Sequence, residues 1–521
     1  MKLGARALAG ALAVGVAGVV ALARSAGSQP AVTNLLEAQS GNIPFAESKH
    51  RADLYDALRI DYALGNGRAG IRFELDRNSE GRFDYQAVTE RWAEWSDPRL
   101  RVRVGNAYTI LGRGLVHRSF ELPGVVLDQP GVRSRYAPSR DVDGVLVEGT
   151  WGPVAGRLLG GTPNSGQFSA APENERFGLP RYQGRLAGGQ WSATLWREAR
   201  VGVAYLRTSN GFGKRDEYGS GFVELDPLRM AGVGDVSLPI YVEYAQANRP
   251  VADWGRFRTG DRDTFALYAS TQLLWGAFAL AAEWKDYREF RLGINDPPSL
   301  VREHGFALLN RGTHVLDAAR ERGFQLEGSW TGRSWGTLTA NLSRSDGRGD
   351  RFDERYLEVH AVPDGDPRWE ATLFWDEGKD EFSFISARRV TGGAATVRFR
   401  AGWAASVDLE QQEATRELVG LPPATFDDRH ASLTASRAGL GSVSLIRERS
   451  TDPEQEDPAL AIGDEVDART FWAGVVQATI SRHHEGTLFV GERRGGRACT
   501  AGTCYEVQPF KGVELRLVTR L

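Results

Sequence analysis

The sequence contains little cysteine and histidine, and its charges nearly cancel. Its 521 residues include two cysteines and eight histidines, and the formal net charge is −3. Two cysteines cannot form the scaffold of a disulfide-rich domain, and a zinc site needs more ligands. Without a global basic field, we expect no nucleic-acid partner. We also expect no metal and no cofactor, and the C-x-x-C-H motif of covalent haem is absent.

Long apolar runs are missing after the first thirty residues, so no later segment reaches the ~20 residues of a membrane helix. The N-terminus itself has Lys2 and Arg6, then the apolar run Ala7–Leu22, then small residues suited to cleavage at Ala21–Ala23 or Ala26–Ser28. This order is typical of a secretory signal peptide, which we assign to residues 1–28. The alternative is a retained anchor helix, but the run is short and interrupted by glycine.

No Pro-, Ser- or Gly-rich hinge divides the remainder, so we expect residues 29–521 to form one domain. What fills this domain is an alternation of apolar and polar residues. From Ala395 to Leu409 every second residue is apolar, and Leu58–Leu64 and Ala69–Leu75 show the same pattern on either side of a glycine-rich turn. A period of two places the apolar side chains on one face of a β-strand, whereas a helix would scatter them.

The number of strands and the lengths of their connections indicate a membrane barrel. We count about 22 to 24 runs of about 9–13 residues, the length that crosses a bilayer at a tilt and more strands than one soluble sandwich holds. We therefore predict an all-β fold, a single large antiparallel transmembrane β-barrel with an even strand number, short periplasmic turns and long extracellular loops. The expected short turns are Ser96–Arg99, Trp151–Pro153, Leu274–Gly276, Thr331–Ser334, Thr391–Gly393, Arg437–Leu440 and Ser481–Glu485. The expected long loops are Arg118–Asp141, Asn248–Gly260, Phe290–Arg320, Glu410–Pro423, Ser450–Asp467 and the residues around Cys499.

Two further features support a place in the bacterial outer membrane. Tryptophans lie beside the short turns, as in an aromatic belt at a membrane interface; they are Trp95, Trp151, Trp275, Trp330 and Trp335. The C-terminal segment Lys511–Leu517 has the form of the signal read by the barrel-insertion machinery, although the chain ends in Leu521 where many barrels have Phe. We expect this machinery, outer-membrane lipid and lipopolysaccharide as partners.

Several motifs look chemical without the context that their chemistry needs. Gly65-x-Gly67-x-x-Gly70 matches a dinucleotide fingerprint, and Gly332-Arg333-Ser334-Trp335-Gly336 matches a nucleophile elbow, but both sit between strands, with no helix to follow. We interpret both as hairpin turns. The acidic stretch Asp452–Asp467 is expected to be a solvated loop; calcium binding, or bridging to lipopolysaccharide, is the alternative. Since no Ser/His/Asp set is connected by its spacing, we predict no catalytic residue and no enzyme.

Short motifs spread over the chain also resemble a known family. They are Asn34–Gln39 with Gly41-Asn42, Val104–Tyr108 with Gly112–Leu115 and Arg118, Lys285-Asp286-Tyr287, Asp296–His314, and Gly495-Gly496 with Cys499 and Cys504. Together they resemble an uncharacterised family of bacterial outer-membrane β-barrel proteins of the Bacteroidota and related phyla. The stretch from Pro297-Pro298 to His314 is the most specific. The resemblance implies a barrel and its location, and it supplies no activity or substrate.

Two functions fit such a barrel. The first is a porin-like channel for small solutes, whose charged lumen sets its selectivity. The second is a non-conducting scaffold that binds a lipoprotein, a periplasmic partner or a surface polymer. The alternative for the charges that line the lumen is that they pair across it and merely fill it. The candidate pore-lining residues are Arg59, Arg72, Glu74, Arg99, Arg101, Arg103, Glu283, Lys285, Arg398 and Arg400.

The longest connection, residues 290–320, combines a rigid Pro297-Pro298 pair with an apolar middle, which suggests a segment that packs. We predict that it folds inward and constricts or plugs the lumen, with arginines meeting wall carboxylates such as Glu283; a lid on neighbouring loops is the alternative. Its candidate residues are Arg302, His304, Asn310, Arg311 and His314. Cys499 and Cys504 are expected to form a disulfide across the last surface loop, because the compartment is oxidising.

Overall fold

The structure is a computed structural model of the whole chain. The expected signal peptide and nearly all of the acidic stretch lie outside the residues that it describes. No helix in the described part of the chain is long and apolar enough to cross a membrane. The described residues are 30–42, 50–79, 84–128, 135–164, 184–196, 198–209, 215–233, 236–248, 264–290, 295, 297–298, 302–315, 320–363, 368–418, 420, 422–452, 468–500 and 503–521.

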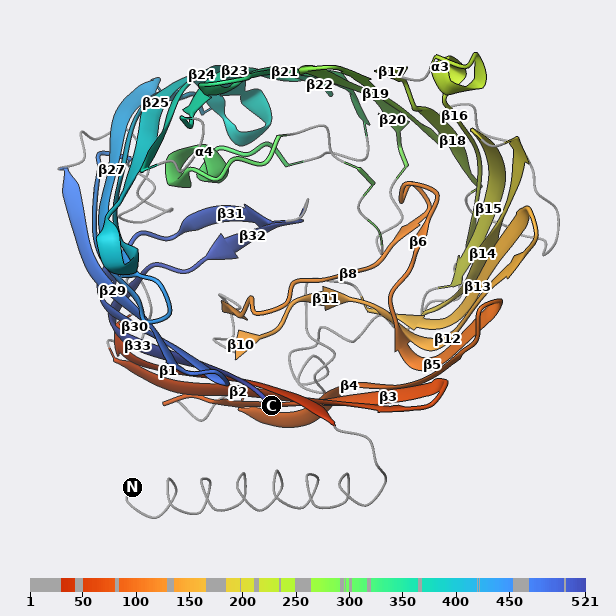
Figure 1. Cartoon of the computed structure of the whole chain (residues 1–521), viewed down its shortest axis with the longest axis horizontal. Coiled ribbons are helices and arrows are strands. Elements are labelled where there is room, and N and C mark those ends of the chain that lie inside the picture. Colours follow the sequence, from red (N-terminus) through yellow and green to blue (C-terminus); the bar gives the residue numbers. More distant parts are fainter. Residues whose placement is uncertain are drawn as a thin grey trace.

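Twenty-four antiparallel strands form one closed barrel, which Figure 1 shows end on. The first twelve are β1 (Ala31–Asn42), β2 (Arg51–Leu64), β3 (Gly67–Arg77), β4 (Tyr85–Ser96), β5 (Leu100–Ala107), β12 (Val142–Trp151), β13 (Val154–Pro163), β14 (Arg185–Trp196), β15 (Ala199–Ser209), β16 (Arg215–Leu225), β18 (Ile240–Asn248) and β19 (Phe265–Trp275). The others are β20 (Phe278–Arg288), β21 (Arg320–Gly332), β22 (Gly336–Gly347), β23 (Asp350–Ala361), β24 (Trp369–Asp380), β25 (Ile385–Arg398), β26 (Trp403–Arg416), β27 (Ala424–Arg437), β28 (Gly441–Ser450), β29 (Arg469–Ser481), β30 (His484–Arg493) and β33 (Phe510–Arg520).

The barrel closes where its first strand meets its last. β1 pairs with β2 on one side and with β33 on the other, and Leu35 lies opposite Val518 in the closing register. The predicted all-β barrel with an even strand number is confirmed. The remaining elements near the rims are β17 (Val236–Ser237), the short helix α3 (Pro227–Met230), and the 3-10 turns η1 (Glu381–Ser383) and η2 (Arg400–Gly402).

The outer face of the barrel is apolar and the inner face is polar. Leu373, Leu433 and Leu445 point outward and are 68%, 59% and 52% exposed. On the same strands, side chains of opposite parity such as Asp376, Asp428 and Glu448 are buried inside. This arrangement suits a wall that has lipid on its outer side, because apolar surface is stable there and lumen groups can pair.

One predicted strand and one predicted turn are wrong. The run Ala395–Leu409 is divided between β25 and β26 by the turn around η2, where Ala401 has a φ of 61°. The predicted turn Thr391–Gly393 lies within β25. The alternation concealed the turn because Phe399 and Trp403, on either side of it, are both exposed apolar residues. Only the hairpin pairing of Val397 with Ala405 shows that the chain reverses.

Short and long connections lie at opposite ends of the barrel. Eight of the nine connections of two or three residues between barrel strands, such as those at Gly65-Asn66 and Arg482-His483, share one end with the start of β1 and the end of β33. There the Val32 N–H donates a 2.9 Å hydrogen bond to the Leu521 carbonyl oxygen. Near these turns Trp95, Trp151, Trp275 and Trp330 are exposed. The other end carries all of the long connections except residues 226–239, which hold α3, and we take it as the extracellular end.

Three connections from the long-loop end enter the barrel (Figure 1). The first inner segment is the described part of residues 108–141, with β6 (Ile110–Leu111), β7 (His117–Arg118), β8 (Phe120–Glu121), β9 (Leu127–Asp128), β10 (Arg135–Tyr136) and β11 (Ser139–Arg140). The second is the described part of residues 289–319, with the helix α4 (Ala307–Arg311). The third is the described part of residues 494–509, with the hairpin β31 (Gly496–Thr500) and β32 (Thr503–Val507).

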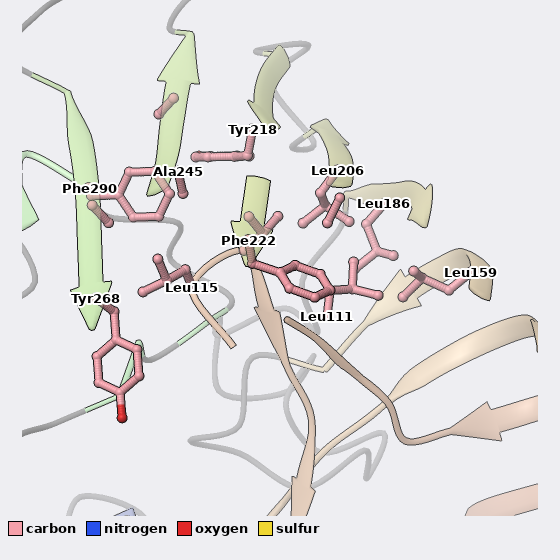
Figure 2. Close-up of a cluster of buried hydrophobic side chains, with 14 of the residues drawn as sticks. Leu111, Leu115, Leu159, Leu186, Leu206, Tyr218, Phe222, Ala245, Tyr268 and Phe290 are labelled. Carbon is pink, nitrogen blue, oxygen red and sulfur yellow. The ribbon is translucent and has the colours of Figure 1, made fainter. Parts of the chain in front are cut away.

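The first inner segment covers an apolar area of the inner wall. Leu111, Leu115 and Val116 are fully buried against inward-facing side chains of β12 to β20 (Figure 2). The wall side of this cluster includes Leu146, Leu159, Leu186, Leu206, Tyr218, Phe222, Tyr241, Ala245, Tyr268 and Tyr287. Burial of this much apolar surface fixes the segment inside the barrel.

Candidate functional site in the barrel lumen

A charged network lines the inner wall where β2, β3 and β4 run side by side. Arg72 is buried and lies 3.0 Å from Glu74, 3.0 Å from Glu121 and 3.5 Å from Glu90. Arg59 joins the network at 3.2 Å from Glu121. Since Glu121 belongs to the first inner segment, its carboxylate connects that segment to the wall. Buried charges are tolerated when they are paired in this way.

The neighbouring strands continue the alternation of positive and negative side chains. Arg101 forms ion pairs of 2.8 Å with both Glu94 and Glu148. Arg103 lies 3.5 Å from Glu94, and its guanidinium lies over the ring of Trp92. The inner wall of β4, β5 and β12 therefore presents matched charges that constrain one another.

On the far wall, Lys285 is completely buried in an ion pair with Glu321. The Tyr268 hydroxyl donates a 3.0 Å hydrogen bond to Glu283. Of the wall groups predicted to line the pore, Lys285 and Glu74 are the most enclosed, whereas Glu283 is half-buried.

The tip of the first inner segment is held by Glu243 of β18. This buried carboxylate accepts hydrogen bonds from the backbone N–H of Arg113 at 2.9 Å and from the hydroxyls of Tyr241 and Ser220 at 2.6 and 2.8 Å. Gly112 has a φ of 59°, and a Cβ there would collide with the Glu243 carboxylate. Glycine is therefore required at the point where the backbone meets the wall.

Asn295 joins the second inner segment to the first. Its Nδ2 donates to the carbonyl oxygens of Gly114 and Leu115 at 2.7 and 3.0 Å, and its Oδ1 accepts from the Arg118 N–H at 2.6 Å. The Tyr287 hydroxyl donates to the carbonyl oxygen of Pro298 at 2.9 Å. The side chain of Asn295 therefore links the second inner segment to the backbone of the first. The wall residue Tyr287 binds the second segment and belongs to the apolar cluster that the first segment covers.

The second inner segment is attached to the wall by rings and charges. Arg302 pairs with Glu327, and its guanidinium lies 4.7 Å from the ring centre of Tyr356. His304 Nε2 lies 3.3 Å from Glu354. Phe306 packs on Phe374 with ring centres 4.1 Å apart, and Leu308 and Leu309 pack on Tyr356, Phe374 and Val390.

Helix α4 has an acceptor for the N–H groups of its first turn. The two oxygens of Glu410 on β26 each accept a 2.8 Å hydrogen bond, from the N–H of Ala307 and of Leu308. Helix starts leave such donors unsatisfied unless an acceptor is supplied. A carboxylate also complements the positive end of the helix.

The far end of α4 is fixed by two arginine contacts. Arg311 forms a two-fold ion pair with Glu448, at 2.8 and 3.1 Å. Burial lowers the pKa of Arg311, but Glu448 outweighs that effect and raises it, so Arg311 stays charged. Arg388 of β25 donates to the Gly312 carbonyl oxygen at 2.6 Å while its other nitrogen lies 3.1 Å from Glu354 and 2.9 Å from Asp376.

His314, near the end of the described part of this segment, lies between two carboxylates. Its Nδ1 lies 3.2 Å from Asp380 and its Nε2 lies 3.2 Å from Glu321, while Phe352 stacks on the ring. Burial acts to lower the pKa of His314, but the hydrogen bonds to Asp380 and Glu321 prevail and raise it above 6.5. His117, in the first inner segment, differs, because burial lowers its pKa to about 4 and Arg140 acts in the same direction.

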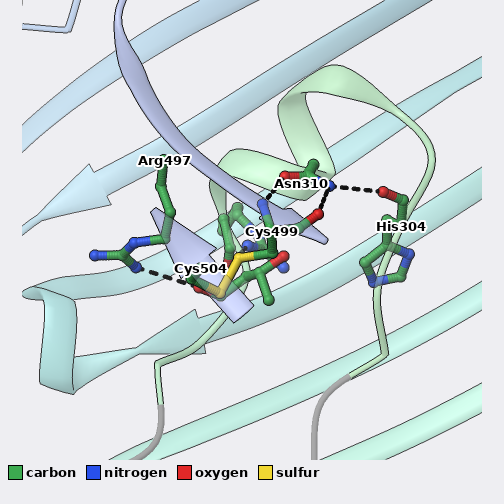
Figure 3. Close-up of a disulfide and its surroundings, with 8 residues drawn as sticks. His304, Asn310, Arg497, Cys499 and Cys504 are labelled. Carbon is green, nitrogen blue, oxygen red and sulfur yellow. Dashed lines mark hydrogen bonds between the residues drawn. A yellow bond between two sulfur atoms is a disulfide. The ribbon is translucent and has the colours of Figure 1, made fainter. Parts of the chain in front are cut away.

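The third inner segment is the hairpin that carries the disulfide (Figure 3). The bond between Cys499 and Cys504 is present as predicted, but the hairpin lies in the lumen, so the expected surface location is wrong. Asn310 of α4 donates to the Cys499 carbonyl oxygen at 3.1 Å and accepts from the Cys499 N–H at 2.7 Å. Arg497 donates to the Thr313 carbonyl oxygen at 3.2 Å. The hairpin and α4 are therefore held as one unit.

Two groups of described side chains have the types of atom that bind metal ions. One is His304, Glu354 and Asp376, and the other is Asp408, Glu410 and His430. In the first, both carboxylates already face the Arg388 guanidinium. In the second, both Glu410 oxygens accept N–H groups of α4. The protein itself thus supplies partners for Glu354, Asp376 and Glu410, and through these residues both groups work as attachment points for the second inner segment.

The other predicted site residues fall in less enclosed places. Arg99 and Arg400 lie in exposed turns at the short-turn end rather than in strands. Arg398 ends β25 and pairs with Glu370 at 2.8 Å. The expected contact of Arg302 and Arg311 with Glu283 is absent, since Glu327 and Glu448 are their partners. Glu327 lies on β21 and Glu448 on β28, so the second inner segment contacts these strands and not Glu283 of β20.

Sequence reasoning missed the wall residues that hold the inner segments. Glu410 was expected in the loop Glu410–Pro423, but β26 continues to Arg416. The signal was available, because Ser406, Asp408, Glu410 and Gln412 continue one polar row beyond the last apolar residue. Glu243, Arg388 and Glu448 are polar residues of three separate strands, and only the fold shows which inner segment each one meets.

Comparisons with known proteins add little to what the structure shows. No protein-family model matches the chain, and no curated protein does. The resemblance to the Bacteroidota-type family therefore stays a prediction. Among solved structures, the P pilus usher (PapC) translocation pore is 11% identical with a TM-score of 0.47, covering 94% of this chain and 99% of the other. The outer membrane protein opdK from Pseudomonas aeruginosa is 11% identical with a TM-score of 0.38, covering 70% and 97%.

The location follows from the architecture itself. In a bilayer every backbone hydrogen-bonding group must be satisfied, and a closed barrel achieves this for strands. The chain has such a barrel, with an apolar outer face and a paired, polar inner wall. It is a protein of the bacterial outer membrane.

Proposed function

We propose that this protein is an outer-membrane channel for small polar solutes, and that the inner segments set the width and selectivity of its passage. The proposal depends on one observation, which is the type of contact that holds the second inner segment against the barrel wall. Its attachments to the wall are mainly ion pairs and hydrogen bonds, through Arg302, His304, Arg311 and His314. A barrel of this strand number has a lumen wide enough for water unless segments fill it.

The charges of the passage belong to the wall and to the inner segments alike. Arg72, Glu74 and Lys285 are enclosed, so the charges open to a solute are Arg59 and Arg101 on one side and the half-buried Glu283 on the other. Such groups, placed where a solute passes, favour or repel it by charge. The selectivity of the channel is therefore proposed to depend on these pairs.

Single-channel recording in planar bilayers tests the proposal. We expect discrete conductance from the purified barrel, and a clear increase when residues 297–314 are replaced by a short Gly/Ser linker, because the second inner segment then leaves the passage. The replacement keeps all twenty-four strands, and slower migration after heating on SDS gels shows that the barrel has formed. A correctly folded replacement variant that conducts like the parent contradicts a constriction by this segment.

A second candidate is a non-conducting scaffold, which the links between the inner segments favour. Asn295 joins the first two segments and Asn310 joins the second to the third. If neither the parent nor the replacement variant conducts, the channel proposal fails. A barrel that holds a lipoprotein, a periplasmic partner or a surface polymer is then the better function, and cross-linking in whole cells is the measurement that identifies its partner.

A further inference from the structure

The outer face of β27 and β28 changes from apolar to basic toward the long-loop end. Leu433 on β27 and Leu445 on β28 are exposed and belong to the lipid-facing band. Continuing on the same outward parity, the next charged residues are Arg429 on β27 and Arg447 and Arg449 on β28. None of these three side chains points into the lumen, where His430 and Glu448 lie instead.

The three arginines are crowded together by the strand register. Arg429 and Arg449 are directly opposite each other in the pairing of β27 with β28, and Arg447 is one outward position further along β28. Like charges placed opposite on one face of a sheet repel each other. Among the described residues, no carboxylate lies within ion-pair distance of any of the three guanidinium groups. The outward acids Glu413 and Asp427 are one step closer to the loops and are paired in register with each other.

The surface between these arginines is hollowed. A cavity of about 360 Å³ on this part of the wall is lined by Gln411, Arg429, Arg447 and Arg449 together with Leu409 and Ala431, and also by Thr391, Gly392, Glu410 and His430. The outward-facing part of this lining therefore combines apolar side chains with cationic and amide donors. Trp472 on β29 is exposed beside it, and the Arg447 guanidinium lies 5.4 Å from its ring centre. Tryptophan at this level is typical of the boundary between acyl chains and headgroups.

We infer that Arg429, Arg447 and Arg449 form a binding site for the phosphate groups of a lipid headgroup, and specifically of the multiply phosphorylated glycolipid in the outer leaflet of the outer membrane. Guanidinium groups bind phosphate through paired hydrogen bonds. A headgroup with more than one phosphate neutralises three crowded cations better than a singly charged phospholipid does. The long-loop end places the site in the outer leaflet, where this glycolipid is found.

The opposite end of the same strands supplies a matched control. There Arg437 ends β27 on the outward face, with its guanidinium 5.5 Å from the ring centre of Trp403. It lines another basic hollow with Arg368 and Arg400. Arg437 has the same charge, the same strand and the same facing as Arg429, but it lies at the other leaflet.

The test is the amount of lipopolysaccharide that stays with the barrel. The full-length protein, its triple variant Arg429→Gln, Arg447→Gln, Arg449→Gln and the control Arg437→Gln are purified from outer membranes in mild detergent. Bound lipid is then counted by native mass spectrometry. We expect the triple variant to lose lipopolysaccharide by about tenfold. The control is expected to retain the parental amount.

Rebinding separates the possible ligands. Delipidated parent protein is placed in nanodiscs that contain lipopolysaccharide, phosphatidylglycerol or neither, with free inorganic phosphate as a fourth arm. Preference for lipopolysaccharide in the parent, lost in the triple variant, supports the site. Equal retention in the folded triple variant overturns it, as it would if the chain's own acidic residues 453–467 neutralised the arginines. Equal losses in the triple variant and Arg437→Gln also overturn it, because general attraction to anionic lipid then suffices.

Discussion

Single side chains on the wall decide where each inner segment lies. Glu243 holds the tip of the first inner segment and Glu410 holds the start of α4, in both cases by accepting backbone N–H groups. Because the donors are backbone N–H groups, these contacts require the wall carboxylate but no particular side chain on the inner segment. The sequence of the inner segment is therefore a poor guide to its docking site, which is set by isolated acids on distant strands.

Replacing Glu410 with Ala is expected to loosen α4 while the barrel remains folded. Loss of a capping acceptor costs about 0.5–2 kcal/mol, and here both oxygens are used. Hydrogen–deuterium exchange of residues 302–315 measures the effect as faster exchange. Glu413→Ala is the matched control, because Glu413 lies on the same strand and faces outward. Equal exchange in the two variants would show that the cap does not hold the helix.

The attachment of the second inner segment at His314 is expected to weaken as the pH rises. The pKa of His314 is raised, so its contribution is complete below the ordinary value of 6.5 and is lost as the pH passes the raised pKa. The groups facing it are Asp380 and Glu321, the latter also paired with Lys285. Exchange of residues 302–315, corrected for intrinsic rates, should therefore accelerate as the pH rises above the ordinary histidine pKa of about 6.5.

Two variants check the source of this pH dependence. His314→Gln should flatten it, because the amide does not titrate. His117→Gln should leave it in place, because the pKa of His117 is about 4 and its ring is neutral over the whole range. Exchange that slows with rising pH in the parent would contradict the sign of the prediction.

At the scale of the element, alternation predicts strands well and predicts their ends poorly. The barrel strands around Leu58–Leu64 and Ala69–Leu75 are as expected, and the glycine turn between them marks the reversal. Between Val397 and Ala405 no such marker was evident, since the turn Phe399–Gly402 keeps an apolar residue at each alternate position. An outward apolar face that continues through a turn at the membrane surface produces the same pattern as one long strand.

The corrected register changes which substitution should harm membrane insertion. Val407 is outward on β26 within the apolar band, so Val407→Arg should destabilise the barrel by about 2–4 kcal/mol if it lies near the midplane. Ala401 lies in the turn with a φ of 61°, so Ala401→Arg should carry no such cost. Urea titration of both proteins in lipid vesicles measures the difference. Equal destabilisation by the two substitutions would contradict the turn at Ala401 and support the single strand Ala395–Leu409 predicted from the sequence.

The disulfide hairpin should influence the lumen without affecting the wall. Cys499 and Cys504 belong to β31 and β32, which pair with each other and lie inside the ring. With both cysteines replaced by Ser, we expect faster amide exchange in residues 496–507 and in α4, which shares hydrogen bonds with Cys499 through Asn310. Exchange in β30 and β33 should stay unchanged, and treating the parent with reductant should reproduce the result.

For the whole molecule, the sequence predicted the barrel wall more completely than the inner segments that lie within it. Strand number, closure and the separation of short from long connections depend on repeated patterns, which many residues specify together. The inner segments have no repeat. Pro297-Pro298 and the apolar Leu308-Leu309 suggested packing for the second one, while the inward position of the Cys499–Cys504 hairpin had no signal of its own. Its place depends on Asn310 and Thr313, nearly two hundred residues earlier in the chain.

The closing pair of strands makes the ring independent of where the chain starts. The backbone groups of Val32 and Leu521 are hydrogen-bonded to each other, so the two ends meet as neighbouring strands elsewhere in the wall do. In the finished barrel no strand is first or last. During synthesis, however, β1 is made before the other barrel strands, and the edge of β1 that pairs with β33 has no partner until β33 has been made. An exposed strand edge invites pairing with other chains. Whatever cellular component escorts this polypeptide must therefore shield one seam from the beginning of synthesis until its end.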